Sequence, residues 1–264
     1  MSNSLRNKLK QCADTFPKRD WFFFTLFALI LLSRPSIDLE NEDTDIKRFE
    51  NKNAGKSLSK QGIDVSHFQG NIDWSAVKEN TAYVYLKATD GITYTDPRFD
   101  ENASQTTKRN IFSGAYHFYE PDDDATAQAV HFVQTIKQYP LALRPVLDIE
   151  ITRGKTEQQL SHGAETFLSY VEKHTGCKPI IYTYASYWDN NLGKAFDDYS
   201  FWLAGYTKKP EPPRKRSQYS LWQYSEKGFI EGIEGAVDRD LYHGNQTGFN
   251  DLFCPNTRKF AENT

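Results

Sequence analysis

The order of apolar and polar residues along the chain predicts eight short strands, all of them after residue 60. Each is a run of four to seven residues rich in β-branched, aromatic or other apolar side chains, bounded by glycine, proline or polar residues. The predicted strands cover residues 62–66, 82–88, 112–118, 145–150, 180–183, 201–205, 220–224 and 235–241.

Two helices are predicted between the second and fourth strands. Asp96 is expected to cap the first helix, with Pro97 in its first turn, and that helix should run to about Arg109. Asp124 is expected to cap the second helix, whose apolar residues recur at helical spacing and which should end before Pro140. Strands and helices therefore alternate here, as they do in parallel α/β folds.

A longer helix is predicted after the fourth strand. Thr156 and Gln159 have the spacing of a capping box, and Gly176 is expected to end the helix. A short helix is expected over residues 187–195, after which three strands follow with little helix between them. This pattern predicts an α/β fold, a single closed barrel whose last strands are joined by loops.

The N-terminal segment has the pattern of an export signal. Basic residues outnumber acidic ones five to two over residues 1–20, and residues 21–32 carry no charged side chain. A helix of that length spans about 18 Å, less than the roughly 30 Å hydrocarbon core, so it fits the apolar part of a signal better than a full span. Residues 33–36 contain no small-residue cleavage pattern, which favours an uncleaved signal-anchor over a cleaved signal peptide.

Four regions are expected from this pattern. Residues 1–33 are the basic, cytoplasmic segment and the signal-anchor or signal peptide, and the charged residues 34–60 form a flexible linker. The barrel is expected over residues 61–253, with a C-terminal tail over 254–264. Because the basic flank should stay in the cytoplasm, the barrel is expected at the periplasmic or extracellular face, anchored to the membrane or otherwise secreted.

Charge and cysteine content limit the partners. A net charge of −3 leaves no basic excess for phosphates, so nucleic acid is not an expected partner. The six histidines are dispersed without metal-binding spacing, and neither a metal nor a cofactor is expected. Cys12 precedes the apolar segment, so only Cys177 and Cys254 would share an oxidising compartment, either as a disulfide or as two unpaired buried thiols.

The fourth predicted strand carries the first candidate chemistry. It ends in Asp148 and Glu150, which point to the same side with Cα atoms about 6.6–7 Å apart, because strand side chains alternate. Two carboxyl groups within reach of one bond are the minimum equipment for glycoside hydrolysis, one staying protonated and the other ionised. The alternative is a strand end with two solvated acids.

The other predicted strand ends also carry polar side chains. The carboxyl-terminal strand ends of such a barrel form one face, where active sites of this architecture lie. Four acids, several tyrosines and a tryptophan at one mouth suit the cleavage of a sugar polymer. The residues expected at this face are Asp64, Ser66, His67, Lys87, Tyr116, His117, Asp148, Glu150, Tyr182, Trp222, Gln223, Tyr224, Asp238 and Asp240.

Seven motif blocks in this region match one known family, in order and at suitable spacing. They are GIDVSHFQG at 62–70 with IDW at 72–74, KATDG at 87–91, GAYHF at 114–118, PVLDIE at 145–150, PIIYT at 179–183, LWQYS at 221–225 and VDRD at 237–240. Through them the chain from about residue 62 to 253 resembles the glycoside hydrolase family 25 lysozymes (N-acetylmuramidases). The resemblance implies a (β/α)5(β)3 barrel that cleaves bacterial peptidoglycan at the β-1,4 bond between N-acetylmuramic acid and N-acetylglucosamine.

The resemblance also implies roles for single residues. Glu150 falls on the family's proton donor, and Asp148 on the acid that steadies the substrate's N-acetyl group during its attack on the anomeric carbon. Asp64 and Asp238 fall on the flanking acids. Phe68 stands where many members have tryptophan, which weakens one expected packing or stacking contact. The substrate-binding positions of the cleft fall on Lys87, Tyr116, Tyr182 and Trp222.

Structural roles are the alternative for some of these residues. Lys87 would then only neutralise the acids, Tyr116 and Tyr182 would be core residues with satisfied hydroxyls, and Asp64 would cap a loop.

Two rival functions remain at this point. A chitinase-like enzyme that cleaves at N-acetylglucosamine also uses D-x-E on the fourth strand, but its longer acid ladder is absent, with Leu143 in place of the first Asp. A catalytically silent cell-wall binding module would have lost an acid such as Glu150, which is present. The enzyme is expected to act as a monomer on peptidoglycan strands.

Overall fold

The structure is a computed structural model that describes residues 60–244 and 246–255. The expected signal-anchor at 21–32 and residues 34–59 of the expected linker lie outside the described residues, whereas Lys60, the last residue of that linker, begins the first strand. Within the described ranges, every helix is too short or too polar to span a membrane.

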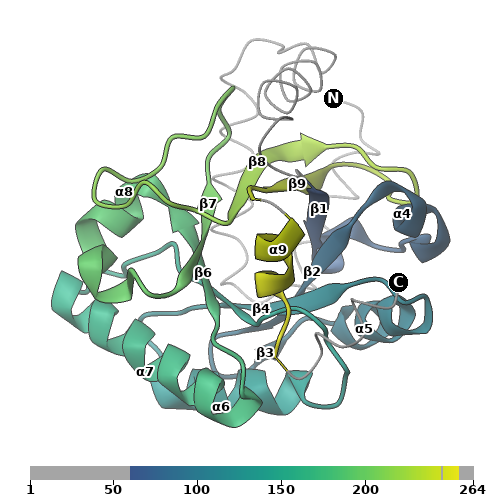
Figure 1. The fold of residues 1–264 in the computed structure, drawn as a ribbon. Coiled ribbons are helices and arrows are strands. Elements are labelled where there is room, and N and C mark those ends of the chain that lie inside the picture. The colour runs from purple at the N-terminus through teal and green to yellow at the C-terminus, as the bar shows by residue number, and fades with distance from the viewer. Residues whose placement is uncertain (1–59, 245, 256–264) are drawn as a thin grey trace, which may run out of the picture. The chain divides into compact units, whose positions relative to one another are not determined.

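Eight strands form a closed barrel, as the hydrophobic pattern predicted (Figure 1). Closure comes from β1, which pairs with β2 on one side and with β9 on the other. A two-residue strand, β3, pairs antiparallel with the end of β2 and was not predicted. The strands are β1 (Lys60–Val65), β2 (Tyr83–Asp90), β3 (Tyr94–Thr95), β4 (Ser113–Phe118), β5 (Val146–Asp148), β6 (Ile180–Tyr184), β7 (Ser200–Ala204), β8 (Leu221–Gly228) and β9 (Val237–Tyr242).

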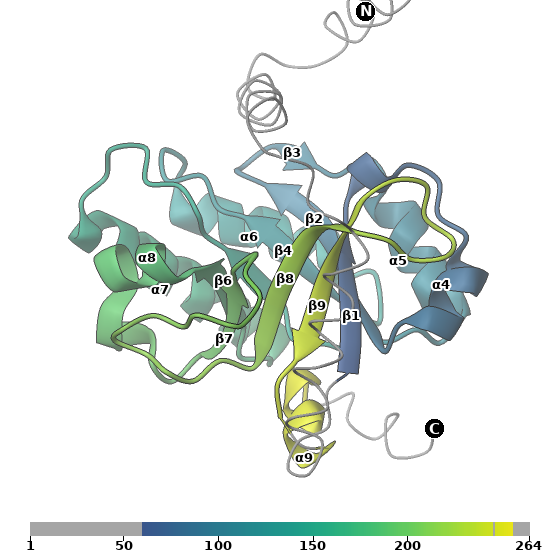
Figure 2. The same cartoon turned by 90° about the horizontal axis from the view of Figure 1, so that it is seen from above.

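Helical connections follow the first five barrel strands and lie outside the ring (Figure 1). The described connections β7–β8 and β8–β9 contain no helix, in agreement with the three helix-poor strands read from the sequence. Figure 2 shows α9 beyond one end of the barrel and β3 at the opposite end. The helices are η1 (His67–Gln69), α4 (Trp74–Asn80), α5 (Phe99–Lys108), α6 (Ala125–Ile136), α7 (Glu157–Thr175), α8 (Ala185–Tyr187), η2 (Trp188–Leu192), η3 (Gly193–Phe196), α9 (Gln246–Phe249) and η4 (Asn250–Leu252).

Most local signals act as predicted. Asp124 caps α6 by accepting from the Ala127 amide, Thr156 and Gln159 form the capping box of α7, and Gly176 ends α7 in the left-handed conformation. The short helix expected over 187–195 is divided among α8, η2 and η3. Helix α4 was not predicted.

Asp96 does not cap α5, which corrects the sequence-based prediction. The helix begins at Phe99 with Arg98 at the N-cap. Asp96 instead accepts from the Arg98 amide through one oxygen and from the His67 amide and ring through the other. Its carboxylate therefore ties the loop after β1 to the loop before α5.

The direction of β9 also corrects the sequence-based view. Seven barrel strands are parallel, but β9 runs antiparallel to both β8 and β1. Its register places Asp238 opposite Asp64 and Asp240 opposite Gly62. Asp238 therefore reaches the carboxyl-terminal face from the beginning of its strand, and Asp240 lies deeper in the barrel.

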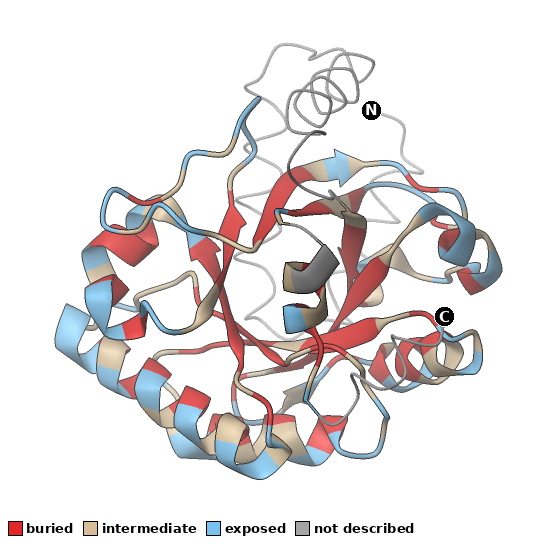
Figure 3. Cartoon of the chain, viewed as in Figure 1, coloured by how far each residue is buried: buried red, intermediate tan, exposed pale blue. Residues whose placement is uncertain are grey.

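Two apolar clusters separate the inside of the barrel from its outside. Along β2, Val84 and Leu86 join the cluster that includes the helices, whereas Tyr83 and Tyr85 join a second cluster without residues of α4 to α8. The second cluster is thus the barrel interior, because strand side chains alternate. A Cβ on Gly62 would lie 2.2 Å from the Tyr83 ring, so this glycine makes room for the tyrosine. Figure 3 shows the strands largely buried and the helices exposed on their outer faces.

A disulfide joins Cys177 to Cys254, with Cα atoms 5.3 Å apart, and decides between the two states left open by the sequence. Cys177 precedes β6, and Cys254 is the first residue of the expected tail. Beside it, Leu143 and Phe253 form an isolated bridge. The bond therefore fastens the segment after α9 to the amino-terminal end of the barrel.

Removal of this disulfide should lower the stability of the barrel. The bond joins residues 77 apart, so its loss in a Cys177→Ser, Cys254→Ser double variant should cost about 4 kcal/mol, or about 10 °C in melting temperature. Thermal denaturation followed by circular dichroism measures the change. A thiol reductant should lower the melting temperature of the wild type and leave that of the double variant unchanged; equal melting of wild type with and without reductant would contradict the assignment.

Candidate active site

The predicted acids converge at the carboxyl-terminal end of the barrel interior. Asp64 of β1 and Asp238 of β9 are register partners, and the side chain of Asp64 is within hydrogen-bonding distance of Asp238. Asp148 ends β5, and Glu150 follows it after one residue. Asp64 and Asp148 are buried, whereas Glu150 is half-buried.

Asp148 and Glu150 lie on the same side, as strand alternation predicted, and their carboxyl groups are close enough for each to shift the pKa of the other. Ile149 between them is fully buried in the outer cluster. The Asp148 carbonyl accepts from the Tyr119 amide, and the Glu150 carbonyl accepts from the Tyr184 hydroxyl at 3.1 Å. The backbone of the pair is therefore held from both neighbouring strands.

Burial is the main cause of the unusual acidity of this cluster. It raises the pKa of Glu150 to about 7 and that of Asp64 to about 6. Burial and the neighbouring Glu150 charge raise the pKa of Asp148 well above its usual range, and burial and Asp64 do the same for Asp238. At neutral pH the cluster therefore holds several protons, and Asp148 and Glu150 share them as a coupled pair.

Lys87 is the cation of β2 that faces this cluster. Its Nζ lies 3.2 Å from an Asp90 carboxylate oxygen and 5.2 Å from the centre of the Phe118 ring. Its charge lowers the pKa of both Asp148 and Glu150, against the larger effect of burial. Lys87 therefore offsets part of the negative charge at the mouth.

A glutamine that was expected at this face but was not assigned a role organises one side of the cluster. Gln223 of β8 donates from Nε2 to Asp64 Oδ2 at 2.7 Å. Its Oε1 accepts from the hydroxyls of Tyr182 at 2.7 Å and Tyr206 at 2.9 Å. Two hydroxyl donors on Oε1 fix the orientation of the amide, so the Nε2 group must point at Asp64.

The predicted tyrosines also belong to the cluster. Tyr182 is buried, and the half-buried Tyr116 packs on the interior apolar cluster. Burial raises the pKa of both hydroxyls well above its usual range, and the charges of Asp64 and Asp148 contribute in each case. Both hydroxyls therefore remain neutral hydrogen-bonding groups at the mouth.

Trp222 is the predicted substrate-binding residue that the structure does not bring to the cluster. Its side chain is 1% exposed, packs in the outer cluster and donates from Nε1 to the Gly205 carbonyl at 2.7 Å. On β8 the residue that faces inward is Gln223, so its neighbour Trp222 must face outward. The geometry gives no support for Trp222 as a stacking platform.

Three residues of the observed network had no predicted role, although two of them, Gln223 and Asp240, were expected at this face. The period-two alternation of β8 contains the signal for Gln223, because Leu221 and Gln223 share one side. Asp240 was expected at the strand ends without a role, and only the antiparallel direction of β9 places it beneath Asp64. Tyr206 follows β7 in a loop, where no pattern in the sequence predicts its contact with Gln223.

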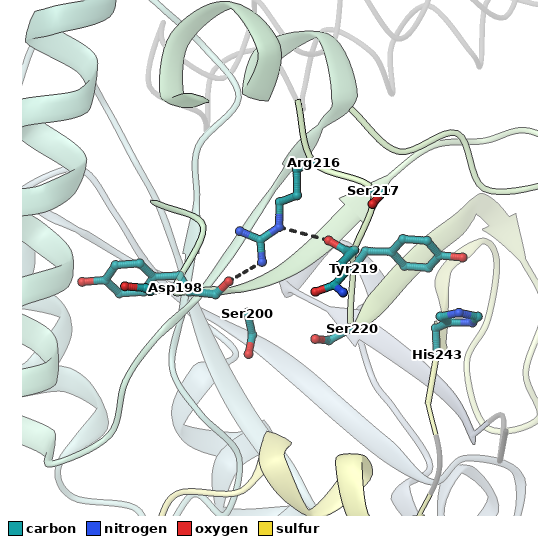
Figure 4. Close-up of a pocket in the computed structure, with 9 residues that line it drawn as sticks. Asp198, Ser200, Arg216, Ser217, Tyr219, Ser220 and His243 are labelled. Atoms are coloured by element: carbon teal, nitrogen blue, oxygen red, sulfur yellow. Dashed lines mark hydrogen bonds between the residues drawn. The ribbon is translucent and has the colours of Figure 1, made fainter. Parts of the chain in front are cut away.

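A separate pocket of about 380 Å³ lies at the opposite end of the barrel (Figure 4). It is lined by Ser200 at the start of β7, Ser220 before β8 and His243 after β9. The guanidinium of Arg216 in its wall donates to the carbonyls of Phe196, Tyr199 and Gln218 and is thereby used in holding loops. None of the predicted site residues lines this pocket.

Among residues 60–244 and 246–255, no group of three or more His, Cys, Asp or Glu side chains is placed to hold a metal ion. Two neighbouring carboxyl groups, with one proton available near neutral pH, instead suit acid catalysis on a sugar bond.

The raised pKa of Glu150 predicts a pH-dependent effect of Glu150→Gln on stability. A carboxyl whose pKa rises from 4.5 to about 7 on folding stabilises the folded state fully below pH 4.5, and this contribution is lost as the pH rises through 7. The variant should therefore gain stability relative to wild type between pH 5 and pH 8, on the order of 3 kcal/mol. Urea denaturation at both pH values measures it. Glu165→Gln, on the exposed face of α7, is the matched control; the same pH dependence in both variants would refute the prediction.

Comparison with known proteins identifies the family to which this chain is similar. The family model described as "Glycosyl hydrolases family 25" matches residues 63–233. Lysozyme M1 of Streptomyces globisporus is 35% identical over 199 residues, which cover 70% of this chain and 68% of that protein. "Uncharacterized protein YegX" of Escherichia coli (strain K12) is 35% identical over 195 residues, 71% of each chain.

A solved structure is similar over almost its whole length. The crystal structure of the bacterial lysozyme from Streptomyces coelicolor has a TM-score of 0.69 and 33% sequence identity, covering 75% of this chain and 98% of that chain. The family model alone matches well over half of the chain. The chain therefore belongs to the glycosyl hydrolases family 25 and is a glycoside hydrolase.

Proposed function

We propose that this glycoside hydrolase is a lysozyme that cleaves bacterial peptidoglycan at the β-1,4 bond between N-acetylmuramic acid and N-acetylglucosamine. The names of its relatives, lysozymes among them, support this substrate class. The arrangement that carries the proposal is the pair of neighbouring carboxyl groups of Asp148 and Glu150 at the barrel mouth, where burial raises the pKa of Glu150 to about 7. A general acid is most effective when its pKa lies near the working pH.

In this mechanism Glu150 donates its proton to the glycosidic oxygen as the bond to the anomeric carbon breaks. The substrate's own acetamido oxygen attacks that carbon, so no protein nucleophile is needed, and the departing sugar leaves with the proton from Glu150. Water then attacks the anomeric carbon of the cyclic intermediate, which releases the acetamido oxygen, and a proton returns to Glu150. Asp148 steadies the acetamido group. Its Oδ1 is buried without a hydrogen-bond donor from the protein, so an acceptor is available for the acetamido N–H.

The remaining cluster positions the sugar and sets the charge. Asp64, held by Gln223, and Asp238 flank the pair, and Lys87 limits the total negative charge. Tyr116 and Tyr182 offer neutral hydroxyl groups that can bind sugar hydroxyls or amides.

The proposal is tested by digestion of purified peptidoglycan sacculi. The wild type should clear sacculi and release fragments with muramic acid at the new reducing ends. Glucosamine ends would favour a chitinase-like specificity, and binding without release would favour a silent cell-wall binding module. Either result contradicts the proposed bond.

Glu150→Gln tests the proton donor. The amide keeps the shape of the carboxyl group but has no acidic proton, so the rate of clearing should fall by about 10²–10⁴-fold. Binding of the variant to sacculi, measured by co-sedimentation, should persist. Glu165→Gln should clear sacculi at the wild-type rate, and retained clearing by Glu150→Gln would remove Glu150 from this role.

We further propose that the barrel acts outside the cytoplasm, with residues 21–32 as an uncleaved signal-anchor. The basic residues before this apolar run and the lack of a cleavage pattern after it support export with retention. The Cys177–Cys254 disulfide gives independent support, because such bonds persist in oxidising compartments.

Fractionation of cells that produce the full chain tests this location. Wild-type protein should sediment with membranes after an alkaline wash, and protease added to spheroplasts should digest it. Deletion of residues 21–32 should leave the protein in the cytoplasm. Wild-type protein in the soluble cytoplasmic fraction, with Cys177 and Cys254 reactive to thiol reagents, would contradict the proposal.

A further inference from the structure

Asp240 is a buried acid that the proposed mechanism does not use. It lies on β9 opposite Gly62 of β1 and opposite Gln223 of β8, two residues along the strand from Asp238. Strand alternation points its side chain into the barrel together with that of Asp238, and Asp240 is 0% exposed. It therefore lies one layer beneath the acid cluster.

The two oxygen atoms of the Asp240 carboxyl group have different contacts. Oδ1 accepts from the Trp202 indole Nε1 at 3.1 Å. Oδ2 is buried and receives no hydrogen bond from a protein donor. The Asp240 and Asp64 carboxyl groups are within hydrogen-bonding distance of each other.

Two ionised carboxylates at that distance would repel each other in a medium of low polarity. A proton on one of them converts the contact into a charge-assisted hydrogen bond, which is among the stronger ones in proteins. The contact between Asp64 and Asp240 therefore requires a proton, and the remaining question is which group carries it.

Gln223 answers this question. Its Oε1 is occupied by two tyrosine hydroxyls, so its Nε2 donates to Asp64 Oδ2 and stabilises the ionised form of Asp64. Asp240 receives a single donor, from the neutral Trp202 indole, and lies deeper in the barrel. Asp64 is therefore the acceptor of the pair and Asp240 the donor.

The charged groups around Asp240 also favour Asp240 as the donor and Asp64 as the acceptor. Burial, Asp64 and Asp238 together raise the pKa of Asp240 well above its usual range, and the pKa of Asp64 lies lower, at about 6. The titratable groups that act on Asp240 or feel its charge are Asp64 on β1, Asp238 on β9, and Tyr83 and Tyr85 on β2.

We propose that Asp240 is a positioning residue that stays protonated and donates a hydrogen bond to Asp64 from the barrel interior, holding Asp64 ionised and directed toward the cleft. Asp64 is thereby held by the Gln223 amide and by the Asp240 carboxylic acid, in addition to its contact with Asp238. This role rests on the proposed lysozyme function only in that Asp64 acts there in its ionised form.

Two substitutions of Asp240 distinguish a protonated side chain that donates a hydrogen bond to Asp64 from an ionised side chain that carries a negative charge. Asp240→Leu removes the donor, so the pKa of Asp64 should rise, and the acidic limb of the pH profile of kcat/KM on soluble peptidoglycan fragments should move up by about one pH unit. Asp240→Asn keeps both contacts, because its amide can donate to Asp64 and accept from Trp202. It should restore the wild-type position of the limb.

An ionised Asp240 and a purely structural Asp240 would each give a different pH profile from the one expected here. If Asp240 were ionised, Asp240→Asn would remove a negative charge, and the acidic limb would move down, which overturns the proposal. If Asp240 had a purely structural role, both variants would lose melting temperature with no movement of the limb, which also overturns it. Trp202→Phe is the matched control, since it removes the other buried contact of Asp240; it should lower the melting temperature and leave the limb in place.

A measurement that needs no substrate tests the protonation of Asp240 independently of the proposed lysozyme function. Infrared spectra of protein with isotope-labelled aspartate should show protonated carboxyl groups at pH 7, and Asp240→Asn should remove intensity from that band. Loss of intensity only from the ionised carboxylate band would overturn the proposal, whatever the substrate of the enzyme. The infrared measurement on Asp240→Asn also determines whether Asp240 is protonated if Asp240→Leu fails to fold.

Discussion

The placement of five carboxyl groups at the mouth of one barrel and in its interior is the constraint on which the site depends. Asp64, Asp148, Glu150, Asp238 and Asp240 all have raised pKa values, and burial is the largest cause in each case. Buried acids of this density are tolerated only when protons, donors and a nearby cation limit their charge. Gln223, Trp202 and Lys87 supply those contacts, and the shared protons supply the rest.

The fold produces this arrangement from simple features. Alternation along β1, β5, β8 and β9 sends one side chain in two to the interior. Aromatic residues such as Tyr83, Tyr85 and Trp202 fill the lower interior, so polar groups collect above them. The antiparallel direction of β9 adds two acids from one strand, at two depths. The disulfide then holds the segment after α9 at the other end, away from the chemistry.

Much of this fold was predictable because its signals are local. Strand runs, the cap at Asp124, the capping box at Thr156 and the glycine stop at Gly176 each act within a few residues. The same-side placement of Asp148 and Glu150 follows from alternation alone. The direction of β9 was not predictable in this way, because strand direction depends on the whole barrel.

The errors at the site have the same origin. Asp96 has the sequence of an N-cap, yet a contact with His67, distant in the sequence, uses its carboxylate instead. Trp222 was assigned to substrate binding from the family resemblance, whereas only one of two neighbours on a strand can face inward, and on β8 that residue is Gln223. The hydrogen bond from Gln223 that orients Asp64 joins residues 159 positions apart, and no local pattern contains it.

The acid cluster makes stability and chemistry compete, because the burial that keeps Glu150 protonated also opposes its ionised form in the folded state. The proposed chemistry therefore depends most on the pKa of the Glu150 carboxyl group. Titration of the Glu150 carboxyl carbon by ¹³C NMR, assigned through Glu150→Gln, measures it most directly. A midpoint near pH 7 is the result that this account predicts, and a midpoint near 4.5, the ordinary value for glutamate, would contradict it.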